Sequence, residues 1–179
     1  MKVVVNAGPL MTLGKLGLVH LLHSLYGSVL IPTAVHKEVV TQGLKLGRPN
    51  AYATQLAIVR RELAVIEVDD ADLSQEVQEL PIGAGEKQVI QLGLTESADW
   101  VLLDDLLARE EAQELGLNVK GTLGILVDAY RAELLTLDEC ELVFQAILIR
   151  EDIWIGKGLV QRVLSGFAEA ARRKRSNKS

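Results

Sequence analysis

The stretch Trp100-Val101-Leu102-Leu103-Asp104-Asp105 places four apolar residues directly before two adjacent carboxylates. An unbroken apolar run of this length is typical of a strand that is buried on both faces of a parallel sheet. In open parallel sheets, ligands bind beyond the carboxyl ends of the strands. Because buried carboxylates are costly unless they are paired or bound to a metal, Asp104 and Asp105 indicate a functional site at this edge.

Strand-like apolar runs alternate with helical patterns along the rest of the chain, which is typical of an α/β protein with a parallel sheet. We therefore predict one domain over residues 1–171, with a parallel sheet sandwiched between helices in an α/β/α arrangement. Two or three further helices are expected over 137–171. The predicted strands are 2–5, 28–31, 63–68, 101–103 and 118–120.

Composition limits the functions that this chain can have. Of its 179 residues, 49% are hydrophobic and only 4% are aromatic, so a core is well supplied and a platform for stacking bases is not. The single Cys140 excludes an intrachain disulfide and a cysteine-based zinc site. This fits a reducing compartment, and no run approaches the roughly 18 to 20 apolar residues of a membrane span. We expect a cytoplasmic protein without membrane association.

The charge distribution is uneven at the C-terminal end. The net charge is -5, which argues against bulk attraction to nucleic acid. Residues 172–179 nevertheless carry a basic cluster of Arg172, Arg173, Lys174, Arg175 and Lys178. We predict a disordered, solvated tail over 172–179, with an arm that binds nucleic acid as the alternative.

Further oxygen-bearing side chains are expected near the same edge of the sheet. Asn6 follows the first strand, Glu38 lies on the helix after the second, and Glu86 opens the helix before the central strand. Oxygen ligands without a His or Cys cluster suit Mg²⁺ or Mn²⁺. Such ions activate water and neutralise charge on a phosphodiester. The other interpretation is structural: Glu86 stabilises a helix N-terminus, Glu38 is solvated and Asp105 caps a helix.

Five segments resemble, in order, segments of the PIN-domain family, and in particular a poorly characterised prokaryotic branch that reads roughly DTSPL, GEGE, LLDD and GTLG. The resemblance covers about residues 2–135. Each piece alone is common, but the ordered set is fairly specific. The segments are VNAGPL (5–10), IPTAVHKE (31–38), GAGE (83–86), LDDLLAR (103–109) and GTLG (121–124).

The resemblance implies a hydrolase, an endoribonuclease directed at single-stranded RNA that is often the toxin of a toxin–antitoxin pair. By position, Glu38, Glu86 and Asp104 would be the catalytic acids that bind Mg²⁺ or Mn²⁺. Asp105 would be either a fourth ligand or the cap of the next helix. The implied partners are single-stranded RNA, an antitoxin protein and a second copy of the chain.

One departure from the family pattern concerns Asn6, where the first strand usually ends in an aspartate. An amide oxygen can ligate a hard cation but brings no charge, so this site should hold Mg²⁺ more weakly. We therefore also consider a catalytically weakened PIN-like module that acts in binding or regulation.

Two more residues have alternative roles at this edge. The hydroxyl of Thr122 can cap the following helix, and in an accessory role it can orient a water or phosphate. Arg109, one turn beyond Asp105, can form a surface ion pair or contact a substrate phosphate.

Overall fold

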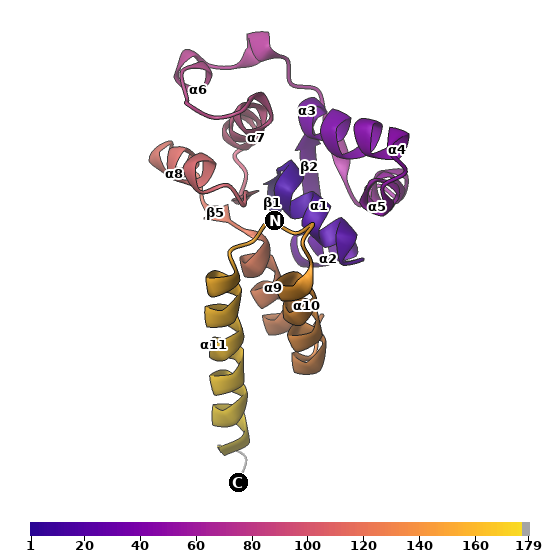
Figure 1. Ribbon diagram of the computed structural model, residues 1–179. Helices are drawn as coiled ribbons and strands as arrows, with labels where there is room; N and C mark the ends of the chain where they lie inside the picture. Colours follow the sequence, from indigo (N-terminus) through magenta and orange to yellow (C-terminus); the bar gives the residue numbers. More distant parts are fainter. Residues whose placement is uncertain (177–179) are drawn as a thin grey trace. The chain divides into compact units, whose positions relative to one another are not determined.

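The computed structural model describes the backbone of residues 1–176 and the side chains of residues 1–167 (Figure 1). By its internal contacts the chain divides into two compact units, Met1–Thr122 and Leu123–Ser179. The first unit contains the sheet and every predicted site residue. In the described part of the chain, no helix is both long and apolar enough to cross a bilayer.

The first unit is built on a parallel sheet in the order β3-β2-β1-β4-β5. Strand β1 lies at its centre, and Val3, Val4 and Val5 are fully buried there. The predicted strands are confirmed, although the third is shorter than expected. The strands are β1 Lys2–Val5, β2 Ser28–Pro32, β3 Ala64–Ile66, β4 Trp100–Leu102 and β5 Val119–Lys120.

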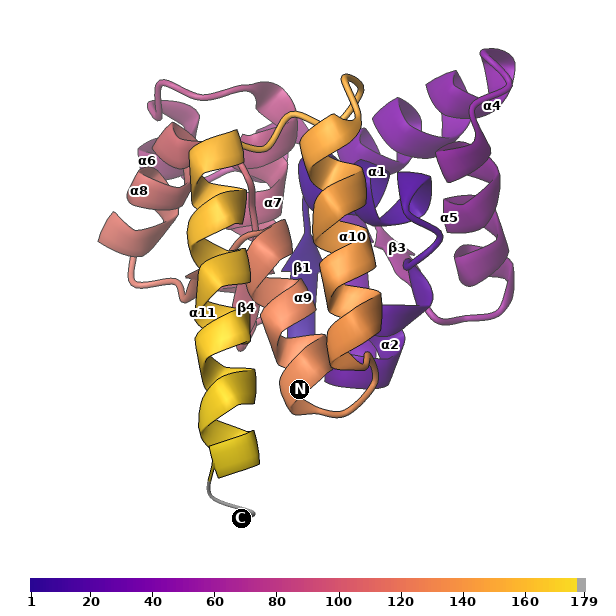
Figure 2. The same ribbon diagram turned by 60° about the horizontal axis from the view of Figure 1, so that its bottom comes forward.

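Helices cover both faces of this sheet, which confirms the predicted α/β/α class (Figure 2). From β1 through β2 to β3 the chain moves in one direction, so right-handed crossovers place these connecting helices on one face. The chain then returns past β1 to β4 and β5, which puts the later helices on the opposite face. The first group is α1 Ala7–Lys15, α2 His20–Tyr26, α3 Thr33–His36, η1 Lys37–Gln42, α4 Gly43–Lys45 and α5 Pro49–Val59. The second is η2 Asp70–Asp72, α6 Gln75–Gln78, α7 Ala84–Thr95 and α8 Leu106–Glu114.

Close backbone contact joins the helices of the first group. A Cβ atom added to Gly14 would lie 2.7 Å from the Cβ atom of Asn50, and one added to Gly43 would lie 2.6 Å from that of Ala51. Both glycines therefore let α5 approach α1 and the α3–η1–α4 segment more closely than any side chain would allow.

The second unit is helical and consists of α9 Thr122–Arg131, which begins at the unit boundary, α10 Leu137–Ile149 and α11 Lys157–Ser176. Phe167 lies edge-on to Tyr130, with ring centroids 4.9 Å apart, and also contacts Phe144. The tail prediction was wrong for residues 172–176, because α11 runs on to Ser176. The sequence from 167 to 175 contains mostly good helix formers, so nothing in it ends the helix. Residues 177–179 lie outside the described residues.

Candidate functional site

The carboxyl ends of β1 and β4 bring Asn6 and Asp104 to the same edge of the sheet. Val5 is paired with Leu102, and the backbone N–H of Asn6 donates to the Leu102 carbonyl at 3.0 Å. The turn after β1 then runs against Asp104, since a Cβ atom on Gly8 would lie 3.4 Å from the Asp104 Cβ atom. Residues separated by almost a hundred positions in sequence therefore leave the sheet side by side.

Asn6 contacts Glu86 directly. Its side-chain Nδ2 donates to Glu86 Oε1 at 3.3 Å, and Asn6 is only 5% exposed. Glu86 lies in the first turn of α7, where the helix dipole favours a negative charge. The amide thus satisfies one oxygen of the Glu86 carboxylate by a hydrogen bond.

Glu38 lies near Glu86 but belongs to the first group of helices, on the opposite face of the sheet from α7. It lies in η1, and its Oε2 atom is 3.9 Å from the position of a Cβ atom on Gly85. The side chain retains access to solvent, yet partial burial raises the pKa of Glu38, and repulsion from Glu86 raises it further. Glu38 and Glu86 are therefore close enough to interact electrostatically.

Thr122 holds both oxygens of Asp104. Its backbone N–H donates to Oδ1 at 2.7 Å and its hydroxyl donates to Oδ2 at 2.6 Å. Burial raises the pKa of Asp104, and the two Thr122 hydrogen bonds and the Arg109 charge only partly oppose that effect. Helix α9 starts at Thr122, and the Thr122 hydroxyl donates to the half-buried carboxylate of Asp104.

Gly121 leaves room for Asp104 and Arg109 to approach each other. A Cβ atom at Gly121 would lie 3.0 Å from Asp104 Oδ1 and 3.3 Å from Arg109 Nη1. The guanidinium of α8 is therefore beside the acid at the end of β4. Arg109 therefore interacts electrostatically with the Asp104 carboxylate.

Asp105 turns away from its neighbour and caps α8. Its Oδ1 atom accepts from the backbone N–H of Ala108 at 2.9 Å, and the side chain is exposed. Of the two roles that the sequence left open, the structure shows the cap.

The donor set at this edge suits a hard cation, but it is not assembled as a cage. All the side chains concerned offer oxygen, which is the chemistry that Mg²⁺ and Mn²⁺ prefer. Within the described residues, however, no three His, Cys, Asp or Glu side chains come together closely enough to hold a metal ion. Asn6 instead donates a hydrogen bond to one oxygen of Glu86.

Gln88 is a buried polar residue, two positions after Glu86, that the sequence analysis missed. It is 8% exposed and links α7 to the first turn of α3. The available signal was a polar residue on the apolar side of a helix, one turn before Leu92, which is also buried.

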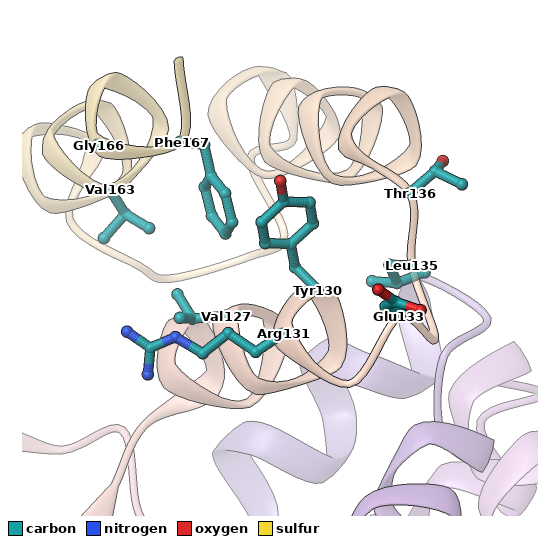
Figure 3. Close-up of a pocket in the computed structure, with 9 residues that line it drawn as sticks. All are labelled: Val127, Tyr130, Arg131, Glu133, Leu135, Thr136, Val163, Gly166 and Phe167. Carbon is teal, nitrogen blue, oxygen red and sulfur yellow. The ribbon is translucent and has the colours of Figure 1, made fainter. Parts of the chain in front are cut away.

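The cavity shown in Figure 3 is lined entirely by the second unit. Its walls are mainly apolar side chains such as Tyr130, Leu135, Val163 and Phe167, with Arg131 and Glu133 among the lining residues. It contains none of the predicted site residues. The convergence of polar groups at the sheet edge, and not this cavity, therefore defines the candidate site.

Comparison with known proteins identifies a family. A family model described as the PIN domain matches residues 2–169, so the match extends well past residue 135 and includes residues of both units. The resemblance drawn from the five segments is thereby confirmed. No curated protein matches the chain.

Proposed function

This chain belongs to the PIN-domain family, a nuclease-type fold, and from that premise we propose that it is a divalent-metal-dependent endoribonuclease that cleaves single-stranded RNA. One observation carries the proposal. Asn6 contacts Glu86, Glu38 interacts electrostatically with Glu86, and Asp104 lies against the turn that follows Asn6. Four oxygen-bearing side chains thus gather at the edge where a parallel sheet binds its ligands.

In this proposal Glu38, Glu86 and Asp104 hold Mg²⁺ or Mn²⁺, with the amide oxygen of Asn6 as a neutral ligand. The bound ion would lower the pKa of a water molecule and neutralise charge on the scissile phosphodiester. Thr122 keeps the Asp104 carboxylate in one orientation through two hydrogen bonds.

Arg109 contributes the positive charge at the edge. Because its guanidinium lies beside Asp104 over the backbone of Gly121, it can donate to the non-bridging oxygens of a phosphate held there. Arginine suits this task, since its planar fork matches the geometry of phosphate oxygens.

Asn6 makes this a weakened site. It supplies one negative charge fewer than an aspartate, and its hydrogen bond to Glu86 competes with metal binding. We therefore propose activity only at elevated metal concentration. The same hydrogen bond favours a second candidate function, a binding or regulatory module that retains the fold without catalysis.

The proposal also includes a toxin role in the cytoplasm, an antitoxin partner and a homodimer. The exposed face of α5 supports a protein partner, since Tyr52, Leu56 and Val59 recur at helical spacing and are 58%, 47% and 68% exposed. The segment 39–61 around them contains four basic residues and no acidic ones. That charge suits an acidic antitoxin helix. The oligomeric state of the chain alone is measured by analytical ultracentrifugation.

Calorimetric titration with Mn²⁺ tests the proposal. We expect the wild-type chain to bind saturably and Asp104→Asn to lose binding. Asp105→Asn is the matched control, because it makes the same charge change at the adjacent position and Asn caps a helix as well as Asp does. Circular dichroism checks the fold of each variant.

The outcomes separate the two candidate functions. Wild-type binding that is lost only in Asp104→Asn, together with cleavage of single-stranded RNA, supports the nuclease. Absence of Mn²⁺ binding by the folded wild type refutes it and favours the module. Equal binding by wild type and Asp104→Asn would place any metal elsewhere.

A further inference from the structure

Gln88 is a buried amide on α7, two residues after Glu86, and it joins two other segments of the first unit. Its Oε1 atom accepts from the backbone N–H of Ala34 at 3.1 Å. Its Nε2 atom donates to Asp70 Oδ1, also at 3.1 Å. The proposed mechanism has no task for this side chain, although it is among the few buried polar residues in the described part of the chain.

The contact with Ala34 is a contact with the segment that carries Glu38. Ala34 lies in the first turn of α3, whose N–H groups have no acceptor within the helix. Helix α3 passes directly into η1, so Glu38 follows Ala34 by about one turn of the same segment. One glutamine side chain therefore ties the helix of Glu86 to the helical segment of Glu38.

Asp70 determines which way the amide of Gln88 faces. An ionised carboxylate only accepts hydrogen bonds, so the NH₂ group must point to Asp70 and the carbonyl must point to Ala34. A glutamate at this position would face Asp70 with a second carboxylate. Glutamine meets both requirements, one donor and one acceptor, at the two ends of a single planar group.

We infer that Gln88 is a positioning residue that fixes the spacing of Glu38 and Glu86 for the cation and phosphodiester that they bind. This inference rests on the proposed function. Residues that orient metal ligands without contacting the metal typically contribute 10- to 100-fold in metal affinity or activity. Gln88 acts in this way through the backbone of α3 and does not touch the ligands themselves.

Gln88→Met tests the inference, because methionine keeps the length of the side chain and loses both hydrogen bonds. The matched control is Gln91→Met on the same helix. Gln91 also links α7 to a neighbouring segment, since its Oε1 accepts from the backbone N–H of Ser74 at 2.9 Å, but that segment carries no site residue. Both variants remove an α7 tether, and only one removes the tether to α3.

Three measurements are made on each variant: hydrogen exchange of the Ala34 amide, the Mn²⁺ dissociation constant from calorimetry, and the melting temperature. For Gln88→Met we expect faster Ala34 exchange and a Mn²⁺ affinity about 10- to 100-fold lower. For Gln91→Met we expect Ala34 exchange and Mn²⁺ affinity like those of the wild type. A purely structural role would lower the thermal stability of both variants and leave Mn²⁺ affinity unchanged.

The exposed Asp70 provides a second variant in case Gln88→Met does not fold. Asp70→Ala should shift Ala34 exchange and Mn²⁺ affinity in the same direction, while Asp70→Asn, which retains an acceptor oxygen, should restore both. Unchanged Mn²⁺ affinity in a folded Gln88→Met protein overturns the inference. If the wild type binds no Mn²⁺, the proposed function fails. The inference about Gln88 is then tested by nuclear Overhauser contacts between α3 and α7. If these contacts are unchanged in Gln88→Met, the inference is refuted.

Discussion

Asn6 controls the charge of the proposed metal site, because an aspartate at this position would place a second carboxylate against that of Glu86. In Asn6→Asp, a carboxylate would replace the donor that now lies 3.3 Å from Glu86 Oε1. Without a cation, two like charges at that distance, one of them at the buried position 6, destabilise the fold by about 1 to 3 kcal/mol. With Mn²⁺ bound, the added charge stabilises the complex. We therefore expect the melting temperature of Asn6→Asp to be below that of wild type in EDTA and to rise more than that of wild type on adding Mn²⁺. Identical responses to Mn²⁺ would contradict this account of Asn6.

The burial of Asp104 makes the stability of the fold depend on pH, and the Thr122 hydrogen bonds partly offset this effect. The pKa of Asp104 is raised from its ordinary value of 3.8, mainly by burial. A carboxyl group with a raised pKa in the folded state is protonated more readily there than in the unfolded chain. Its contribution to the free energy of unfolding is therefore greatest at acid pH and is lost as the pH rises through the raised pKa. The pKa of Glu38 is likewise raised from its ordinary value of 4.5, so its contribution to the free energy of unfolding changes with pH in the same direction.

Thr122→Val tests this coupling by removing the hydroxyl bond to Asp104 Oδ2. The pKa of Asp104 should rise further. At a pH above the raised pKa of Asp104, where the carboxylate is ionised, we expect the free energy of unfolding to fall by about 1.5 to 3 kcal/mol. The loss should be smaller at a pH below that pKa. Urea unfolding in metal-free buffer at both pH values measures the difference, and an equal loss at the two would show that the bond does not depend on ionisation.

How far the sequence determines each residue of the site depends on how local its role is. For Asp105 the sequence left a helix cap and a fourth metal ligand open, although adjacent strand-end residues face opposite ways, and the structure shows the cap. Asn6 and Asp104 could be placed at one edge because parallel strands share a carboxyl end. The Asn6–Glu86 and Gln88–Ala34 bonds could not be predicted, because each depends on where α7 crosses the sheet relative to β1 and α3.

At the scale of elements, alternating strands and helices predict the α/β class but not the order of the strands. The order becomes functional through the return crossover from β3 to β4, which places β4 beside β1. Without that pairing, Asn6 and Asp104 would not lie at the same place. The same crossover contains η2, α6 and α7. Asp70, Glu86 and Gln88 therefore all belong to this one connection.

The close packing of α1 on α5 gives a prediction at this scale. Gly14→Ala would bring a methyl group to 2.7 Å from the Asn50 Cβ atom and 3.2 Å from its backbone oxygen. We expect the free energy of unfolding to fall by about 1 to 3 kcal/mol, although alanine is the better helix former. Gly166→Ala in α11 is the control, because among the described residues no atom outside the adjoining helix backbone lies within 4 Å of the added methyl group. It should stabilise by about 0.5 to 1 kcal/mol. Chemical denaturation compares the two, and the same sign for both would refute the packing argument.

At the scale of the whole molecule, an acidic protein that binds RNA must do so through local charge. The net charge is -5, so long-range electrostatic attraction does not favour binding of RNA. Each basic side chain that contacts a phosphate therefore contributes noticeably to the affinity. Arg109 lies beside Asp104, at the edge where the proposed phosphodiester sits. On single strands, each phosphate contact contributes about 0.7 to the slope of log affinity against log salt concentration.

Arg109→Ala should therefore weaken binding of a single-stranded RNA in the presence of EDTA, which prevents cleavage, and lower the salt slope by about 0.7. The control is Arg150→Ala. It removes the same charge from a residue whose guanidinium is already paired with Asp152 at 2.8 Å, so affinity and slope should not change. Fluorescence anisotropy of labelled RNA at several salt concentrations measures both quantities. Equal slopes for wild type and Arg109→Ala would show that this arginine serves Asp104 alone, and equal losses in both variants would show that only net charge matters.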